Sequence, residues 1–394
     1  MIPPAVLAPV LAPVLAPAPT LAAWFHDLDP VILPIAGSLA VRWYGVSYLL
    51  GFVLAYLVLR ALAARGLTPI PRDRIADAML LLVLGVMAGG RLGYALLYEP
   101  AILVEFSASP PFWSLLALNR GGMASHGGFV GVILAAWWIS RGFKDDHGNR
   151  VGACPPLHVM DMCALVAPIG LTLGRIANFI NGELLGRVVA APGQPAPWYA
   201  VRYPQEIIER PLDRLPHTDD QLDRIVELSM TKMLPGETDW MLGYQRVLES
   251  IQRGDAALKA QLEPLISARY PTQLLQAFFD GALVLIVVWI IARRPRVPGV
   301  IGAWMLIVYA LGRIAMDWVR LPDAGIAQFG PLTRGQLYSL LMLVVAVAVL
   351  LWTRRSSAPA PMGGWGVRHP APGAGGSDAD PSSGSSGSSG PTGS

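Results

Sequence analysis

The sequence predicts an all-α, polytopic membrane protein with about seven transmembrane helices. Of its 394 residues, 53% are hydrophobic and only 14% are charged, whereas soluble domains are roughly 25% charged. The hydrophobic excess collects in runs of about 20 residues, the length at which a helix crosses ~30 Å of hydrocarbon. Lys and Arg cluster in alternate connections between these runs, as is typical of a chain that crosses a membrane repeatedly.

The apolar runs place the candidate spans along the chain. They cover residues 43–62, 75–97, 124–140, 157–177, 274–292, 299–318 and 336–352. The transmembrane core is therefore expected in two parts, with the first four spans in residues 24–186 and the last three in residues 271–353.

The remaining segments differ from the spans in composition. Residues 1–23 repeat VLAP, and proline at that spacing breaks helices, so we expect a low-complexity Ala/Pro arm. Residues 187–270 are polar and mixed in charge, with candidate helices near 220–233 and 243–267, which predicts a small head outside the membrane. Residues 354–394 are rich in Gly, Ser and Pro, as is typical of a disordered tail.

The positive charges set the expected orientation. Connections after the first, third, fifth and seventh predicted spans carry most of the basic residues near the membrane. They are Arg65, Arg72 and Arg74; Arg141, Lys144 and Arg150; Arg293, Arg294 and Arg296; and Arg354 and Arg355. Because basic loops stay in the cytoplasm, the amino end and the head are expected outside, and the carboxyl end inside.

Polar side chains gather near the outer ends of several predicted spans. Arg175 and Asn178 lie one turn apart at the end of the fourth span and share a helix face. A stripe at helical spacing follows the sixth span and consists of Tyr309, Arg313, Asp317 and Arg320. Other groups at this depth are Arg42, Tyr44, Tyr48, Arg91 and His126.

This concentration of arginine predicts an anion site. Ionisable residues inside a membrane are costly, so they usually face a cavity and carry function. Arginine is permanently charged and donates two parallel hydrogen bonds to phosphate, which favours a phospholipid headgroup as the ligand. His126 adds the side chain that exchanges a proton near neutral pH.

Each residue also has a structural interpretation. Arg42 or Arg320 could extend its side chain to the interface, and Arg313 could form an intrahelical ion pair with Asp317. His126 could flank a packing face of small residues. Several such coincidences at one depth favour a site over the separate structural explanations.

Several motifs resemble those of the bacterial prolipoprotein diacylglyceryl transferases. The signature of that family is similar to GRIANFINGELLGR at residues 174–187. Five further motifs occur in the family's order, namely VRWYGVSY, GGRLGY, GGMASHGGFVG, YPTQLLQ and GRIAMDWVRLPD. The resemblance covers roughly residues 24–353.

The resemblance implies a multi-pass enzyme of the bacterial inner membrane, with a periplasmic amino end and head and a cytoplasmic carboxyl end. Its active site would face the periplasmic leaflet. Family members transfer the diacylglyceryl group of phosphatidylglycerol to the lipobox cysteine thiol of a prolipoprotein, forming a thioether and releasing glycerol-1-phosphate, the first step of lipoprotein maturation. Expected partners are phosphatidylglycerol, prolipoprotein signal peptides with a lipobox cysteine, and membrane lipids. No nucleic acid, cofactor or metal is expected.

The family's motif positions supply the candidate site residues. The expected catalytic residues are His126, Arg175, Arg313 and Tyr44. The expected substrate-binding residues are Asn178, Glu183, Gly186 and Asp317 from those motifs, together with Arg91 and Arg320, which are included because they lie among the polar groups at the outer ends of the predicted spans. Asp317 stands where the family more often has glutamate. Tyr270 and Gln276 stand where familiar members have His and Glu, so no role is transferred to them.

A mechanism follows as a hypothesis. Arg175 and Arg313 would clamp the phosphate, Asn178 and Tyr44 would position the headgroup, and His126 would be the base for the thiol. Asp317 or Glu183 would orient an arginine. The rival interpretations are a phospholipid transporter or flippase, and a membrane scaffold. A transport pathway would be expected to show polar groups at both leaflets, often with internal repeats.

Overall fold

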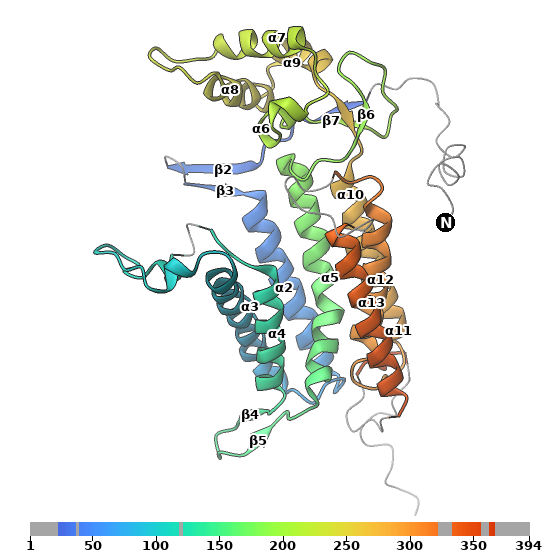
Figure 1. Cartoon of the computed structure of the whole chain (residues 1–394). Helices are drawn as coiled ribbons and strands as arrows, with labels where there is room; N and C mark the ends of the chain where they lie inside the picture. The colour runs from blue at the N-terminus through green and yellow to red at the C-terminus, as the bar shows by residue number, and fades with distance from the viewer. Residues whose placement is uncertain (1–22, 37–38, 118–120, 322–332, 356–361, 367–394) are drawn as a thin grey trace, which may run out of the picture.

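The computed structural model of the chain describes residues 23–36, 39–117, 121–321, 333–355 and 362–366. In these residues a bundle of long helices carries a smaller head at one end (Figure 1). We refer to that end of the bundle as the head end. The predicted arm, except for Ala23, and residues 356–361 and 367–394 of the predicted tail lie outside the described residues.

Every predicted span coincides with a helical segment. The bundle helices are α2 (Trp43–Ala64), α3 (Ile75–Leu97), α4 (Ser125–Ile139), α5 (Pro156–Asn181), α10 (Thr272–Gln276), α11 (Leu283–Ile291), α12 (Val300–Met316) and α13 (Arg334–Thr353). Among the described residues, 5 helices are long and apolar enough to cross a membrane. They are Trp43–Ala64, Arg72–Leu97, Pro156–Asn181, Thr272–Ile291 and Gly335–Thr353. The helices α4 and α12 are apolar but shorter, with 15 and 17 residues.

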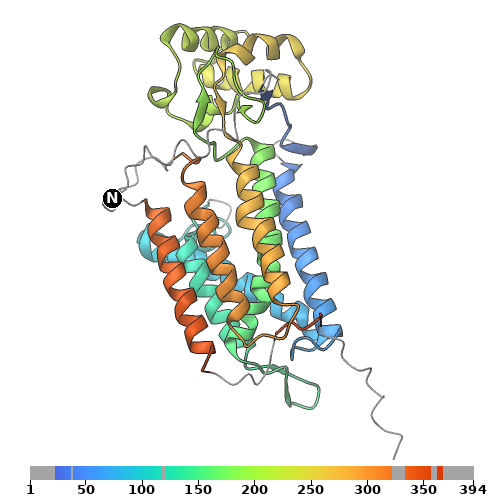
Figure 2. The same ribbon diagram turned by 90° about the vertical axis from the view of Figure 1, so that its right-hand side faces the viewer.

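Helix α5 lies at the centre of the bundle. It packs against α2, α4, α12 and the segment that leads into α11, and Figures 1 and 2 show it between α2 and the helices of the carboxyl-terminal half. Its side chains Val159, Met162 and Leu165 are buried in the main apolar core. A central helix can therefore present polar groups to several neighbours at once.

Helices α3 and α4 approach each other through glycine. A Cβ atom at Gly131 would lie 1.9 Å from the carbonyl oxygen of Gly85, and one at Gly127 would lie 2.1 Å from that of Gly89. Small residues allow this close contact of two backbones, which is a common way to pair helices in lipid.

The fifth predicted span is one continuous helical segment with an irregular middle. Between α10 and α11, residues Ala277–Ala282 form the π-helical turn η8, drawn in gold beside α5 in Figure 2. A Cβ atom at Gly281 would lie 2.2 Å from Thr172 Oγ1 of α5, so glycine is required for this contact. Single π-turns inside α-helices are rare and occur frequently at functional sites.

The head is built on a small mixed sheet. Its strands are β1 (Trp24–Phe25), β6 (Val188–Ala190), β7 (Val201–Arg202) and β8 (Ala268–Arg269), in the order β1-β7-β8-β6. β1 is parallel to β7, and the other pairs are antiparallel. The all-α prediction is therefore wrong for the head. The segment before the first span, which was predicted to be core, contributes an edge strand.

Helices cover the rest of the head. They are α6 (Glu206–Glu209), α7 (Asp219–Met230), α8 (Trp240–Gln252) and α9 (Ala256–Leu262). The predicted helix at 220–233 corresponds to α7. The predicted helix at 243–267 is two helices, because Gly254 has a φ of 100° and ends α8. A Thr218 capping box fixes the start of α7.

Short elements connect these parts. Strands β2 (Val31–Ala36) and β3 (Leu39–Arg42) form a hairpin at the head end, and β4 (Phe143–Lys144) and β5 (Arg150–Val151) form one at the opposite end (Figure 1). Single 3₁₀ turns occur at Arg72–Arg74, Pro100–Leu103, Ser114–Leu116, Leu212–Arg214 and Glu263–Leu265.

Part of the predicted tail is ordered. Met362 is fully buried, and its backbone exchanges two 2.9 Å hydrogen bonds with that of Arg296. The ring of Trp365 lies 5.6 Å from that of Trp289. The prediction of a disordered tail is therefore wrong for residues 362–366. The side chains of Met362 and Trp365 pack against the main apolar core, a contact that amino-acid composition alone does not predict.

Candidate functional site

The carboxyl end of α5 organises the first part of the candidate site. Gly182 adopts the left-handed conformation, with φ 69°, and ends the helix. The chain then turns back, so that Glu183 lies over the last helical turn. Tyr44 Oη donates to Glu183 Oε2 at 3.1 Å, and Asn181 Nδ2 donates to Glu183 Oε1 at 3.1 Å. Asn178 Nδ2 donates to the hydroxyl of Tyr44.

The segment after Glu183 is attached to the start of α10. Gln273 Nε2 donates to the carbonyl oxygen of Glu183 at 2.5 Å, and Thr272 Oγ1 donates to that of Leu184 at 3.1 Å. A Cβ atom at Gly186 would lie 2.3 Å from the carbonyl oxygen of Tyr270. Gly186 is therefore required for packing, and the signature segment is held on two sides.

A second cluster of polar residues lies where α12 meets α13. Arg313 NH1 donates to Asp317 Oδ1 at 2.9 Å, and Thr333 Oγ1 donates to Asp317 Oδ2 at 2.6 Å. Thr333 also caps α13 by accepting from the backbone of Gln336. One oxygen of Asp317 thus contacts the guanidinium of Arg313, and the other is held by Thr333. The orienting role that the sequence predicts for an acidic residue stays a prediction.

The charge of Arg175 acts on residues of both polar regions, the one around Glu183 and the one around the end of α12. It acts on Tyr44 and also on Asp280 and Tyr309. Arg313 and Arg320 act on Asp280 as well. The arginines of α5 and of the chain around the end of α12 therefore act electrostatically on the same polar residues at the head end of the bundle.

Asp280 is the principal residue that the sequence interpretation missed. It lies in the π-turn η8 and is only 1% exposed. In the part of the chain that the structure describes, neither carboxylate oxygen has a hydrogen-bond partner. The available signal was its position as the single acid inside the apolar run 274–292, since an ionisable residue within a span suggests function.

His126 and Arg91 are placed differently from the arginines around Asp280. The ring of His126, on the first turn of α4, meets the ring of Tyr338 edge-on at 5.2 Å. Tyr338 lies one turn beyond Gly335, and a Cβ atom at Gly335 would lie 3.1 Å from Arg313 NH2. Helix α13 therefore contacts His126 at Tyr338 and approaches Arg313 at Gly335, and the structure shows no direct hydrogen bond between these two described residues, His126 and Arg313.

Arg91 is buried, and its five N–H donors are directed at carbonyl oxygens. Nε donates to Leu115 at 2.8 Å, NH1 donates to Gly121 and Gly122, and NH2 donates to Ser114 and Ala117. This arrangement holds the α3–α4 connection in place. A direct phosphate contact would require Arg91 to exchange those bonds, so the geometry favours a positioning role.

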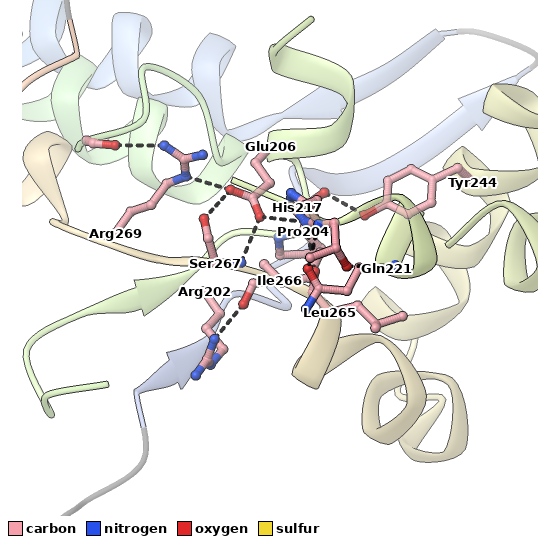
Figure 3. Close-up of polar contacts among 12 residues, drawn as sticks. Arg202, Pro204, Glu206, His217, Gln221, Tyr244, Leu265, Ile266, Ser267 and Arg269 are labelled. Carbon is pink, nitrogen blue, oxygen red and sulfur yellow. Dashed lines mark hydrogen bonds and ion pairs between the residues drawn. The ribbon is translucent and has the colours of Figure 1, made fainter. Parts of the chain in front are cut away.

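The head contains a buried polar cluster that the sequence interpretation also missed (Figure 3). Glu206, fully buried, accepts from Arg269 Nε at 2.6 Å, from Ser267 Oγ at 2.5 Å and from Ser267 N at 2.8 Å. Arg269 NH1 also donates to the carbonyl oxygen of Gly186 at 3.1 Å. The head is therefore joined to the signature segment through a charged network.

Burial sets the titration of two histidines in the head. His217 Nε2 donates to the carbonyl oxygen of Leu265 at 2.8 Å and lies 3.6 Å from Glu206. Burial lowers the pKa of His217 below its ordinary value, although Glu206 acts in the opposite direction. Burial likewise lowers the pKa of His26, which packs among Phe179, Tyr203 and Trp24.

The opposite end of the bundle also holds buried polar groups. Asp161 accepts from the backbone of Gly299 at 2.8 Å and of Gly302 at 2.7 Å. His158 is paired with Thr68 at 2.9 Å. The Asp161 carboxylate caps α12 at its amino end, so these groups have structural partners.

The fold and this site define a class: a multi-pass membrane protein with an arginine-rich polar site at one end of its bundle. Residues 30–352 match the family model of prolipoprotein diacylglyceryl transferase, so the chain belongs to that family.

Similar proteins carry the name phosphatidylglycerol–prolipoprotein diacylglyceryl transferase. The one from Bdellovibrio bacteriovorus is 36% identical over 365 residues, which cover 87% of this chain and 97% of the relative. The one from Stenotrophomonas maltophilia is 33% identical, with 84% and 94% covered. The one from Burkholderia thailandensis is 34% identical, with 85% and 97% covered. The resemblance expected from the motifs is confirmed.

Proposed function

We propose that this chain transfers the diacylglyceryl group of phosphatidylglycerol to the lipobox cysteine of prolipoproteins. Family membership and the names of its relatives support this reaction. The observation that carries it in the structure is that the charges of Arg175, Arg313 and Arg320 all act on one buried residue, Asp280, inside an apolar bundle. A positively charged region of this kind suits a phosphodiester whose acyl chains stay in lipid.

The reaction is a substitution at carbon. The cysteine sulfur forms a bond to the glyceryl carbon that bears the phosphate ester, and the C–O bond to phosphate breaks. The bonding pair leaves with glycerol-1-phosphate, and the thiol proton passes to a base. Because a thiol has a pKa of about 8.5 and its thiolate is the nucleophile, deprotonation must be assisted.

The arginines are assigned to the phosphate. Arg175 and Arg313 bind its oxygens and stabilise the charge that develops on the leaving group, as fixed donors do in other transfer sites. The ion pair with Asp317, closed by Thr333, keeps the guanidinium of Arg313 in one orientation. Arg320 adds positive charge to the same region.

The cluster around Glu183 is assigned to positioning. Asn178 and Tyr44 direct their polar groups toward the headgroup, and Glu183 fixes both of them. Gly186 keeps this segment close to α10. Arg91 holds the α3–α4 connection, from which α4 and therefore His126 begin.

His126 is assigned as the base for the acceptor thiol. It contacts Tyr338 of α13, and Gly335, one turn earlier on α13, lies against Arg313, so α13 borders both His126 and Arg313. The signal peptide would then approach from the side of α13, so that its cysteine comes between the imidazole and the bound phosphate ester. A neutral imidazole accepts a proton efficiently near pH 7.

The membrane arrangement is part of the proposal. α4 and α12 complete the bundle as transmembrane helices, with the basic connections in the cytoplasm and the head in the periplasm of an inner-membrane protein. Residues 24–186 and 271–353 form the core, and residues 187–270 together with β1 form the head. The site then lies at the periplasmic leaflet, where prolipoproteins emerge.

The test uses purified protein in detergent, phosphatidylglycerol, and a peptide with a lipobox cysteine. We expect glycerol phosphate release and a matching diacylglyceryl gain in peptide mass, both dependent on the cysteine. A peptide with Cys→Ser is the control. Absence of any mass gain across several phospholipids, with folding verified, would contradict the proposal and direct attention to lipid translocation.

A further inference from the structure

Within the described part of the chain, the carboxylate of Asp280 is an acceptor without a donor. It is 1% exposed, and neither oxygen has a hydrogen-bond partner among the described residues. Such a group is expensive to bury unless it is paired. By contrast, Asp317 on the neighbouring helix has both oxygens occupied. The fold therefore keeps two carboxylate oxygens of Asp280 available for donors that the described residues do not supply.

Glycine residues on two sides leave room for the side chain of Asp280. Gly281 brings η8 against Thr172 of α5. On the other side, a Cβ atom at Gly312 of α12 would lie 3.5 Å from Asp280 Oδ1. The carboxylate thus lies between α5, which carries Arg175, and α12, which carries Arg313. On α12 it faces Gly312, the residue that precedes Arg313.

The charges around Asp280 limit what the missing donors can be. Burial disfavours the charged carboxylate, and the positive charges of Arg175, Arg313 and Arg320 act in the opposite direction. The same arginines are assigned to the phosphate under the proposed function. A ligand that binds both the arginines and Asp280 must carry a phosphate for the arginines and, a few bonds away, neutral hydrogen-bond donors for the carboxylate. A phosphate oxygen itself would be repelled by the carboxylate.

We propose that Asp280 binds the terminal hydroxyl groups of the phosphatidylglycerol headgroup. The two oxygens of one carboxylate can accept from two vicinal hydroxyls, and hydrogen bonds to a charged acceptor are the strong kind. Asp280 is then a specificity-determining residue: the arginines bind any phosphodiester, and Asp280 selects a polyol. This inference rests on the proposed function and specifies its substrate contact.

The experiment compares headgroups with and without hydroxyls. Transfer to the lipobox peptide is measured with phosphatidylglycerol and with phosphatidylmethanol, whose headgroup lacks hydroxyls, for the wild-type protein and for Asp280→Asn. We expect Asp280→Asn to lower kcat/KM about 10-fold or more for phosphatidylglycerol. For phosphatidylmethanol it should change kcat/KM by less than about threefold, because no hydroxyl contact is lost.

Two results would overturn the proposal. Equal losses with both lipids would mean that Asp280 acts only through the arginines, and no loss with either would mean that it does not contact substrate. Asp161→Asn is the matched control, since this other buried aspartate caps α12 at the opposite end. It should affect both lipids alike, with any change in thermal unfolding recorded beside it.

A second readout separates this inference from the proposed function. Binding of glycerol-1-phosphate and of methyl phosphate is measured directly, without turnover. A preference for glycerol-1-phosphate that Asp280→Asn removes would support the inference even if no transfer occurred, whereas equal binding by the wild-type protein would overturn it. If Asp280→Asn fails to fold, the wild-type protein is tested with headgroups of two, one and no hydroxyls, and affinity should fall at each step.

Discussion

At the scale of single residues, the candidate site separates groups that are fixed from groups that are free to react. Glu183 contacts Tyr44 and Asn181, and its backbone oxygen accepts from Gln273. With these hydrogen bonds Glu183 can hold neighbouring side chains in position, and it is poorly placed to exchange hydrogen-bond partners during a reaction. His126 contacts the ring of Tyr338, and an imidazole held in this way can still accept a proton.

This difference leads to a prediction for His126→Gln. If the imidazole is the base, transfer should fall by about 10²–10⁴, while binding of phosphatidylglycerol stays within a few-fold because the arginines are unchanged. Initial rates of glycerol phosphate release and lipid binding in detergent would be measured on the same sample. Substantial remaining activity would remove His126 as the base and leave activation of the thiol to the positive potential.

Arg313→Lys tests the geometry of the phosphate clamp. Lysine keeps the charge but loses the planar fork that Asp317 orients. We expect kcat/KM to fall about 100-fold, with thermal unfolding close to that of the wild-type protein. The pair of measurements is needed because a folding defect would also lower activity. Full activity of the lysine variant would show that a point charge is sufficient.

At the scale of elements, glycine contacts set where the polar ends meet. Gly85 and Gly131 bring α3 and α4 into backbone contact, and Gly281 seats η8 on α5. Helix α4 carries His126 and η8 carries Asp280, so both side chains depend on contacts that exclude a methyl group. The positions of these candidate site residues are therefore set by packing several residues away.

Gly131→Ala should destabilise the α3–α4 pair. The new Cβ atom would meet the carbonyl oxygen of Gly85 at 1.9 Å, and forced overpacking typically costs about 1–3 kcal/mol. Thermal unfolding in detergent should show a clear decrease. Gly170→Ala, where no heavy atom lies within 4 Å of the new Cβ, is the matched control. Equal behaviour of the two variants would contradict the packing argument.

The sequence predicted more of the helices than of the irregular elements, for a physical reason. Apolar runs of membrane length leave few alternatives to a helix, and stripes such as Arg313 with Asp317 need only helical spacing. Asp280 was missed because its proposed role depends on a π-turn and on facing helices that a local pattern does not contain. The head was predicted poorly because its sheet joins Trp24 to residues near Val201 across the first four spans.

At the scale of the whole molecule, the head and the bundle act as one unit. Arg269 bonds both to Glu206 inside the head and to the carbonyl oxygen of Gly186 in the signature segment. His26 extends the connection, because its Nε2 lies 2.6 Å from the carbonyl oxygen of Phe179 in α5. A change in the packing of the head should therefore reach the polar end of α5.

The head should lose stability on acidification. Burial lowers the pKa of His217 below its ordinary value of 6.5, so the unfolded chain binds the proton first as the pH falls. Stability that is present above pH 6.5 is then lost progressively as the pH drops toward the folded-state pKa. His217→Gln should flatten this dependence in hydrogen-exchange measurements of α7 and α8. An unchanged dependence would assign it to His26 or other groups.

The orientation of the whole molecule gives the last prediction. Asp220 in the head and Asp146 in the β4–β5 hairpin are both exposed and lie at opposite ends of the bundle (Figure 1). With the head in the periplasm, Asp220→Cys should react with a membrane-impermeant maleimide in spheroplasts, and Asp146→Cys should react only after lysis. Burial raises the pKa of the native Cys154 thiol to about 11, so its thiolate is scarce and the wild-type protein should give little background. Labelling of Asp146→Cys in intact spheroplasts would reverse the orientation and move the site to the cytoplasmic leaflet, away from emerging prolipoproteins.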